Sequence, residues 1–179
     1  MTSSNRATHL LTAPRSGEVV VLRFDGRQVA VWWGPDGDLD RLAVQSGLVL
    51  TWPTAAACEE HARQQGWVGL GADDGDEAIG HSALDFEPAQ AWLRGRRNVV
   101  DVKSALELWN SQWDVTASLT GAYPVLRRLE HRCHEKLTTA NVPWLVGEDV
   151  YRPRWTAAEL RSLRHVLSKA VHVLRTSLR

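Results

Sequence analysis

Two short motifs combine cysteine with histidine, the side chains that most often bind zinc in proteins. Cys58 and His61 are one helical turn apart, and His131, Cys133 and His134 could supply further nitrogen and sulfur ligands. Each cysteine also falls in line with small or apolar residues on its expected helix, where a free cysteine packs as a small hydrophobic side chain. We therefore favour core positions for both cysteines and predict neither a metal nor another cofactor.

Two acidic stretches resemble calcium loops only in composition. Asp36, Asp38 and Asp40 alternate as at the start of an EF-hand, but Arg41 replaces its glycine and Gly47 replaces its final glutamate. The second stretch has no ordered ligand spacing and consists of Asp73, Asp74, Asp76 and Glu77. We interpret both stretches as solvated loops whose charge is free to meet a partner.

Residues 75–84 contain two incomplete catalytic or phosphate-binding motifs. Gly75–Ser82 has the spacing of a P-loop, but His81 stands where lysine is needed, and two acids inside the loop would repel phosphate. The same segment begins like a nucleophile elbow at Ser82, but Leu84 replaces the second glycine. No catalytic residue is predicted here, and whether the protein is an enzyme stays open.

Charge is distributed unevenly along a chain whose formal net charge is zero. Residues 1–93 contain six arginines and thirteen acidic residues, a net charge of −7, whereas residues 125–179 carry a net charge of +6. Such asymmetry indicates an acidic surface for a basic partner, a basic surface for an anionic one, or two halves that pack on each other.

The basic residues offer a nucleic-acid hypothesis without a recognition motif. Arg94, Arg96 and Arg97 form one cluster, and the last helix presents basic residues opposite its leucines. The chain has 18 arginines and 3 lysines in an alanine- and leucine-rich background, as is typical of a high-GC genome, so arginine abundance alone carries little weight. A solvated face suited to the negative end of the helix dipole is the alternative.

Tryptophan is overrepresented, with nine residues against two Phe and two Tyr. Trp32 and Trp33 are adjacent on a predicted strand, so their side chains point to opposite faces. One of them needs a second layer, a helix or a ligand to cover it. We predict Trp32 as an anchor for a partner, because tryptophan is enriched at binding surfaces.

The N-terminal half has the pattern of a hairpin followed by short elements. Asp25-Gly26 between Glu18–Phe24 and Arg27–Trp33 predicts a two-residue turn that pairs Glu18 with Trp33, with the mostly apolar Glu18 face toward the core. The following elements are a helix over Leu39–Gln45 capped by Asp38, a strand over Leu48–Trp52, a helix from Thr54 to Gln65 stopped by Gly66, a strand around Ala83–Phe86 and a helix from Pro88 through Leu93.

The C-terminal half changes to helical periodicity. One helix starts at the cap Asp101, another at Pro124, and the last at a capping box formed by Thr156 and Glu159. The fold class is therefore α+β: an N-terminal antiparallel hairpin or small sheet with short helices, then a bundle of three longer helices packed on it. We expect residues 1–17 to be a flexible segment and residues 18–179 to form a single domain.

Function follows from what these patterns contain and lack. No apolar run reaches the ~20 residues needed to span a bilayer, the first 17 residues lack a signal-peptide core, and two cysteines fit a reducing compartment. We expect a cytoplasmic bacterial protein with no membrane partner, which binds another, basic macromolecule through its acidic loops as an inhibitor or immunity-type protein does. The alternatives are a Trp-lined pocket for a small molecule, with His61, His81, His131 or Glu107 as acid–base groups, and nucleic-acid binding. Oligomeric state is left open.

Overall fold

The Asp25-Gly26 dipeptide forms the turn around which the sheet is built. The computed structural model describes residues 10–70, 78–147 and 150–178. It pairs β2 (Ser16–Phe24) with β3 (Arg27–Asp36) in the predicted register, including Glu18 opposite Trp33. Both turn residues have a positive φ, 52° for Asp25 and 70° for Gly26, as a type I′ turn requires.

Two further strands extend the hairpin on either side. β4 (Leu39–Leu42) pairs antiparallel with β3, and β8 (His81–Asp85) pairs parallel with β2, so the strand order is β4-β3-β2-β8. The sheet is therefore mixed, because β8 returns to β2 after a long connection. Shorter pairings involve β1 (Leu11–Thr12), β5 (Val44–Gln45), β6 (Leu48–Val49) and β7 (Val68–Gly69).

The helix predicted over Leu39–Gln45 is wrong, because the chain there forms β4 and β5. Gly37 and Asp38 make a two-residue turn that returns the chain beside β3, with Gly37 at a φ of 65°. Aspartate is favoured in turns as well as at helix N-caps, so Asp38 alone could not distinguish the two. The predicted strand over Leu48–Trp52 is shorter than expected, since only β6 and an isolated bridge at Trp52 are present.

The helices follow the predicted caps closely. They are α1 (Ala55–Gln65), α2 (Glu87–Leu93), α3 (Val102–Thr120), α4 (Arg128–Asn141), the 3-10 helix η1 (Pro143–Val146) and α5 (Ala157–Ser177). The predicted caps of α1, α3 and α5, at Thr54, Asp101 and Thr156, each accept a backbone N–H bond. α4 begins four residues later than its predicted start at Pro124, because Arg127 is extended and its N–H is capped by Glu130 at 2.8 Å.

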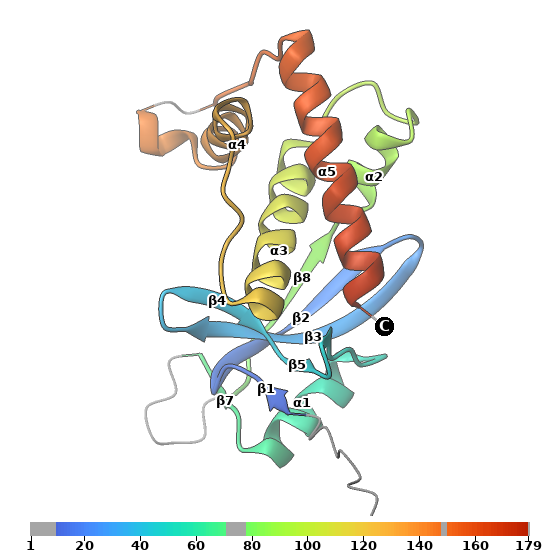
Figure 1. The fold of residues 1–179 in the computed structure, drawn as a ribbon, viewed down its shortest axis with the longest axis vertical. Coiled ribbons are helices and arrows are strands. Elements are labelled where there is room, and N and C mark those ends of the chain that lie inside the picture. Colours follow the sequence, from blue (N-terminus) through green and yellow to red (C-terminus); the bar gives the residue numbers. More distant parts are fainter. Residues whose placement is uncertain (1–9, 71–77, 148–149, 179) are drawn as a thin grey trace, which may run out of the picture.

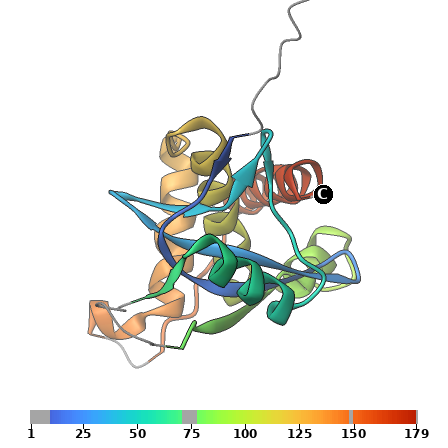
Figure 2. The same ribbon diagram turned by 90° about the horizontal axis from the view of Figure 1, so that it is seen from below.

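The two faces of the sheet are covered by different helices (Figure 1). Val20, Leu22 and Phe24 pack into the main core with α3 and α5. Val19, Ala30 and Trp32 point the other way and pack on Cys58 and Ala62 of α1. Figure 2, seen from the side of α1, shows this helix lying across the strands. The helix α1 is thus the second layer, and it covers Trp32, one of the two adjacent tryptophans.

The fold is α+β, with a C-terminal helical bundle packed on an N-terminal sheet. β1 and the first two residues of β2 lie within the segment 1–17, so the described fold begins before residue 18. The last helix reaches back to the hairpin turn, where Asp25 accepts two hydrogen bonds from Arg175 at 2.6 and 2.7 Å and one from Arg94 at 2.5 Å. Oppositely charged residues of the acidic and basic parts of the chain therefore pair with each other and join the sheet to the helices. Among the helices described, none is long and apolar enough to cross a membrane.

Candidate functional site

A cavity of about 270 Å³ lies on the face of the sheet that packs against α3 and α5, beside the C-terminal part of α3. Its lining combines an apolar wall, three carboxylates and one hydroxyl. The lining residues are Glu18, Val20, Trp33, Gly34, Pro35, Asp40, Leu70, Ser82, Leu84 and Asp114. We call this cavity the acidic pocket.

The register of the sheet places the strand residues of the acidic pocket on one face. Glu18 is opposite Trp33 on β3, and Val20 is opposite Ser82 on β8. These side chains therefore share the side of the sheet that faces α3 and α5. The Ser82 hydroxyl donates to a Glu18 carboxylate oxygen at 3.1 Å, which fixes that carboxylate at the wall of the pocket. Gly34 permits the close strand approach here, since a Cβ at this position would lie 2.0 Å from the Ser16 carbonyl oxygen.

Tyr123 connects Asp40 and Asp114, the two residues that supply the remaining carboxylates of the pocket. Its hydroxyl oxygen accepts a hydrogen bond from the Asp40 backbone N–H at 2.9 Å and is also hydrogen-bonded to the side chain of Asp114. Tyr123 follows the end of α3 in sequence, while Asp40 lies on β4, so this contact joins the bundle to the β3–β4 hairpin. Its own pKa is raised, chiefly by burial.

Asp114 has the most perturbed carboxyl group in the pocket. Burial raises its pKa to about 7, and the nearby charge of Asp40 adds to this effect, while the hydrogen bond from Tyr123 opposes it. Near neutral pH, this carboxyl group therefore exchanges its proton readily. A positive charge brought into the pocket would favour its ionised form.

No cation in the described part of the chain forms an ion pair with the carboxylates of the acidic pocket. Among the ion pairs of residues 10–70, 78–147 and 150–178, none involves Glu18, Asp40 or Asp114. The one ion pair of the adjacent hairpin joins Arg41 to Asp36 at 3.2 Å. Three carboxylates against one wall of apolar side chains form a site suited to an ammonium or guanidinium group.

The structure places the described residues of the predicted partner-binding set in two different environments. Asp36, Asp38 and Asp40 are exposed on the β3–β4 hairpin, and Asp40 reaches the pocket. Trp32 is fully buried, with 0% exposure, and its indole N–H donates to the Pro14 carbonyl at 3.0 Å. Trp32 therefore does not present a surface to a partner, since α1 covers it. The predicted residues Asp73, Asp74, Asp76 and Glu77 lie outside the described residues.

Trp33, rather than Trp32, is the tryptophan that faces the cavity. The sequence indicated that the two must point apart, but not which of them would lie beside open space. The clearest signal for the pocket was Glu18, an acidic residue on the otherwise apolar face of the hairpin. The sequence contained no comparable indication for Asp114 and Tyr123, because their contacts with the pocket depend on where α3 ends against the sheet.

The cysteine and histidine motifs are not brought together. Cys58 and His61 lie on α1, whereas His131, Cys133 and His134 lie on α4, in the bundle across the sheet (Figure 1). Within the described part of the chain, no group of three or more His, Cys, Asp or Glu residues is placed to hold a metal ion. Burial raises the pKa of the Cys58 thiol to about 12 and that of Cys133 to about 11, which keeps both thiols protonated.

The proposed acid–base residues also lie away from the acidic pocket. His61 is packed between Trp52 and Trp67, with ring centroids 5.1 and 5.6 Å away. The three others contact side chains within the protein: His81 contacts Glu59, His131 contacts Glu135, and Glu107 forms an ion pair with Lys103. None of the four lines the pocket, so the acid–base group that does is Asp114.

Several basic residues of the nucleic-acid hypothesis are engaged internally. Arg94 and Arg175 both bind Asp25, and Arg97 lies 3.2 Å from Asp101. Arg164 stacks over the Trp92 ring at 4.3 Å. These cations tie elements to one another, which leaves Arg96 as the member of the Arg94–Arg97 cluster without an ion pair among the described residues.

Comparison with protein-family models, with curated protein sequences and with solved structures finds no match to this chain.

Proposed function

We propose that this protein is a non-enzymatic binding protein that holds a basic partner protein at the acidic pocket. The observation that carries the proposal is the convergence of Glu18, Asp40 and Asp114 on one cavity without a paired cation among the described residues. A lysine or arginine side chain from a partner would supply that charge. The apolar wall around Trp33 would contact the aliphatic stem of the same side chain.

The surroundings of the pocket support a macromolecular partner. Asp36 and Asp38 are exposed on the hairpin beside it, and acidic residues around a binding site accelerate the approach of a basic protein. The acidic residues at 73–77 follow the lining residue Leu70 in the sequence and belong to the same proposal. An inhibitor or immunity-type protein of a bacterial cytoplasm, covering a basic site of its target, is the concrete form that we propose.

Charge reversal at the hairpin tests the partner. We expect tagged protein to capture a stoichiometric basic partner from its host, and the double variant Asp38→Lys/Asp40→Lys to lose it. The control variant Glu60→Lys/Glu135→Lys changes the net charge equally, on exposed helix positions away from the pocket. Capture that is equal for both double variants, or that is insensitive to salt, would contradict the proposal.

Small probes test the pocket itself. We expect n-butylammonium and N-ethylguanidinium to bind with millimolar affinity and to shift the carboxyl carbon resonance of Asp114, whereas neutral n-butanol does so much more weakly. The shift of the pocket resonances should be lost in the double variant Asp40→Asn/Asp114→Asn. Equal binding of n-butanol would mean that the cavity recognises apolar groups rather than cations.

A small cationic molecule is the second candidate ligand, and one observation favours it. Asp114 has a pKa of about 7, so it can hold and release a proton at the pocket near neutral pH, as an acid–base group of an enzyme does. Binding of a free amine tighter than about 10 µM would favour this function, because a single side chain of a protein partner does not reach that affinity alone.

A further inference from the structure

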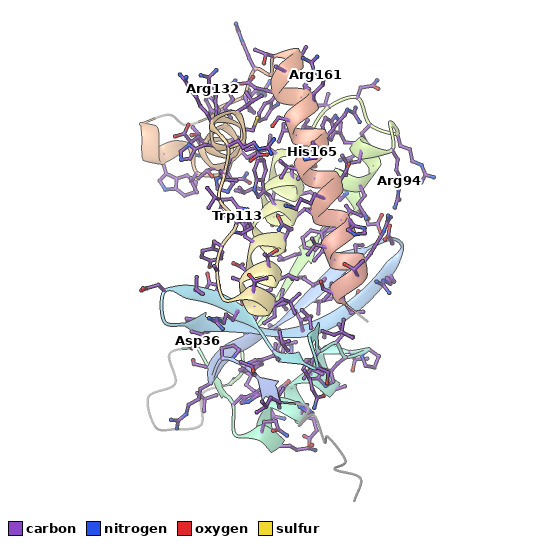
Figure 3. All side chains as sticks on the ribbon, in the orientation of Figure 1. Asp36, Arg94, Trp113, Arg132, Arg161 and His165 are labelled. Carbon is purple, nitrogen blue, oxygen red and sulfur yellow. The ribbon has the colours of Figure 1, made fainter. Side chains whose placement is uncertain are left out.

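The helical end of the molecule carries arginines that form no ion pair with the acids of residues 10–70, 78–147 and 150–178. Five of them are exposed, and none of the five forms an ion pair with another described residue. They are Arg128 and Arg132 on α4, Arg152 and Arg154 in the segment before α5, and Arg161 on α5. We call these five residues the arginine surface. Figure 3 labels Arg132 and Arg161 at this end of the molecule, far from Asp36 on the sheet.

Contacts between α4 and α5 bring the arginine surface together. Lys136 on α4 donates to the Arg154 carbonyl at 2.8 Å and to Glu159 at 2.7 Å, so the segment before α5 runs beside α4. Arg128, Arg132 and Lys136 are spaced four residues apart and therefore form one row along α4. Lys136 is neutralised by Glu159, which leaves the arginines as the free charges of the row.

The described acids at this end already have partners. Glu130 accepts the N–H of Arg127 at 2.8 Å, and Glu135 lies 3.3 Å from His131. Glu159 is buried and bound to Lys136. Glu148 and Asp149 lie outside the described residues. Among the described residues at this end, the five arginines and Lys136 outnumber the acids Glu130, Glu135 and Glu159 by six to three.

An exposed tryptophan lies at the other end of α4. Trp144 on η1 has 68% of its surface exposed, whereas Trp32 and Trp109 are fully buried. η1 packs against α4, whose row of arginines begins at Arg128. An exposed aromatic ring combined with a row of cations is the arrangement by which proteins bind single strands, since bases stack on the ring while cations follow the phosphates.

We propose that the arginine surface and Trp144 form a binding site for single-stranded nucleic acid. Guanidinium groups suit this ligand because they bind phosphate oxygens in pairs. This site keeps Arg161 of the last helix from the nucleic-acid hypothesis based on the sequence, whereas Arg94, Arg97 and Arg175 of that hypothesis are used inside the protein. It also lies at the opposite end from the acidic pocket, so the two proposals stand or fall separately.

Fluorescence anisotropy with labelled dT20 and rU20 tests this site. We expect binding that weakens with salt, with a slope of log K on log salt concentration of about −3.5 for five phosphate contacts. Arg132→Gln/Arg161→Gln should weaken binding by about tenfold and flatten the slope by about 1.4. The control Arg15→Gln/Arg23→Gln removes two exposed arginines of the sheet half and should leave affinity within about twofold.

Trp144→Ala separates stacking from charge. We expect it to weaken oligonucleotide binding at least about fivefold, with Trp144→Phe retaining most of the affinity. Because Trp144 is exposed, circular dichroism and thermal unfolding should be unchanged in both variants. Unaltered affinity in Trp144→Ala, or equal binding to polyglutamate of matched charge or to vesicles containing phosphatidylserine, would overturn the proposal.

Discussion

At the scale of single residues, Asp25 performs two tasks, one within its own turn and one with an arginine 150 positions further along the chain. It adopts the left-handed conformation of the hairpin turn, and its carboxylate binds Arg175 and Arg94. The hydrogen bond from Arg175 is the main reason that its pKa is lowered to about 2. One acidic residue therefore joins the sheet to the end of the last helix.

Asp25→Asn tests this link without disturbing the turn, because Asn-Gly also favours type I′ geometry. The lowered pKa stabilises the native state above pH 4, and this stabilisation is lost as pH falls through about 2. We expect the variant to lose about 1–2 kcal/mol of unfolding free energy at pH 7 and almost none near pH 2. Urea unfolding at both pH values measures the difference, and Asp38→Asn is the control, because Asp38 lies at the other hairpin turn and forms no ion pair with a described residue.

The protonation of Asp114 changes the free energy of unfolding with pH in the opposite direction. Its raised pKa means that the folded protein keeps the proton while the unfolded chain loses it, so this group costs stability as pH rises from 4 to about 7. We expect Asp114→Asn to match the parent protein at pH 4 and to be more stable by about 2 kcal/mol at pH 8. Equal unfolding free energies at pH 8 would show that the carboxyl group is not desolvated. Such a cost of stability is typical of functional positions.

At the scale of elements, α1 decides which tryptophan is available. It covers Trp32, whose ring lies 5.4 Å from that of Trp67. We expect Trp32→Ala to lower the unfolding free energy by about 3–5 kcal/mol, since it leaves a cavity between α1 and the sheet. A loss below 1 kcal/mol, measured by urea unfolding, would instead indicate that Trp32 is accessible, as the sequence suggested.

The strand crossing at the pocket depends on glycine. A Cβ at Gly34 would meet the Ser16 carbonyl oxygen and the Gly17 Cα at 2.0 and 2.7 Å, and backbone atoms cannot move aside as side chains do. We expect Gly34→Ala to destabilise the protein by about 2 kcal/mol or more. Gly80→Ala is the control, because its nearest neighbour would be 3.5 Å away, and its effect should stay within about 0.5 kcal/mol. Thermal unfolding of the pair measures both.

At the scale of the whole molecule, the net charge is zero, but one end is acidic and the other is basic. The acidic pocket lies on the sheet, and the arginine surface lies on α4 and the start of α5. Exposed charges separated by more than about 10 Å are screened from each other at physiological salt. Each end can therefore engage an oppositely charged partner without competition from the other.

We expect the two ends to bind independently. Saturation with dT20 should leave the affinity for n-butylammonium unchanged within about twofold, because the sites share no residue. Asp38→Lys/Asp40→Lys should likewise leave oligonucleotide binding within about twofold. Calorimetric titration in both orders measures this coupling. A tenfold change in either affinity would place both ligands at a common site.

The sequence by itself determined the elements whose signals are local. The Asp25-Gly26 turn fixed the β2–β3 register, and the caps Thr54, Asp101 and Thr156 fixed three helix starts, because these signals act over a few residues of backbone. It failed at Leu39–Gln45, where one local signal fits both a turn and a cap. The sequence showed Glu18 on an otherwise apolar strand face, but it did not predict that Glu18 would line a pocket.

Tertiary structure alone decided which charges are free. Asp25 reaches Arg175 and Asp40 approaches Asp114 only because β2, β4, α3 and α5 pack together, and sequence distance carries no information about such encounters. Burial by α1 removed Trp32 from the surface, while burial at the end of α3 raised the pKa of Asp114. Desolvation and ion pairing depend on neighbours in space, so both candidate binding sites became visible only once the chain was folded.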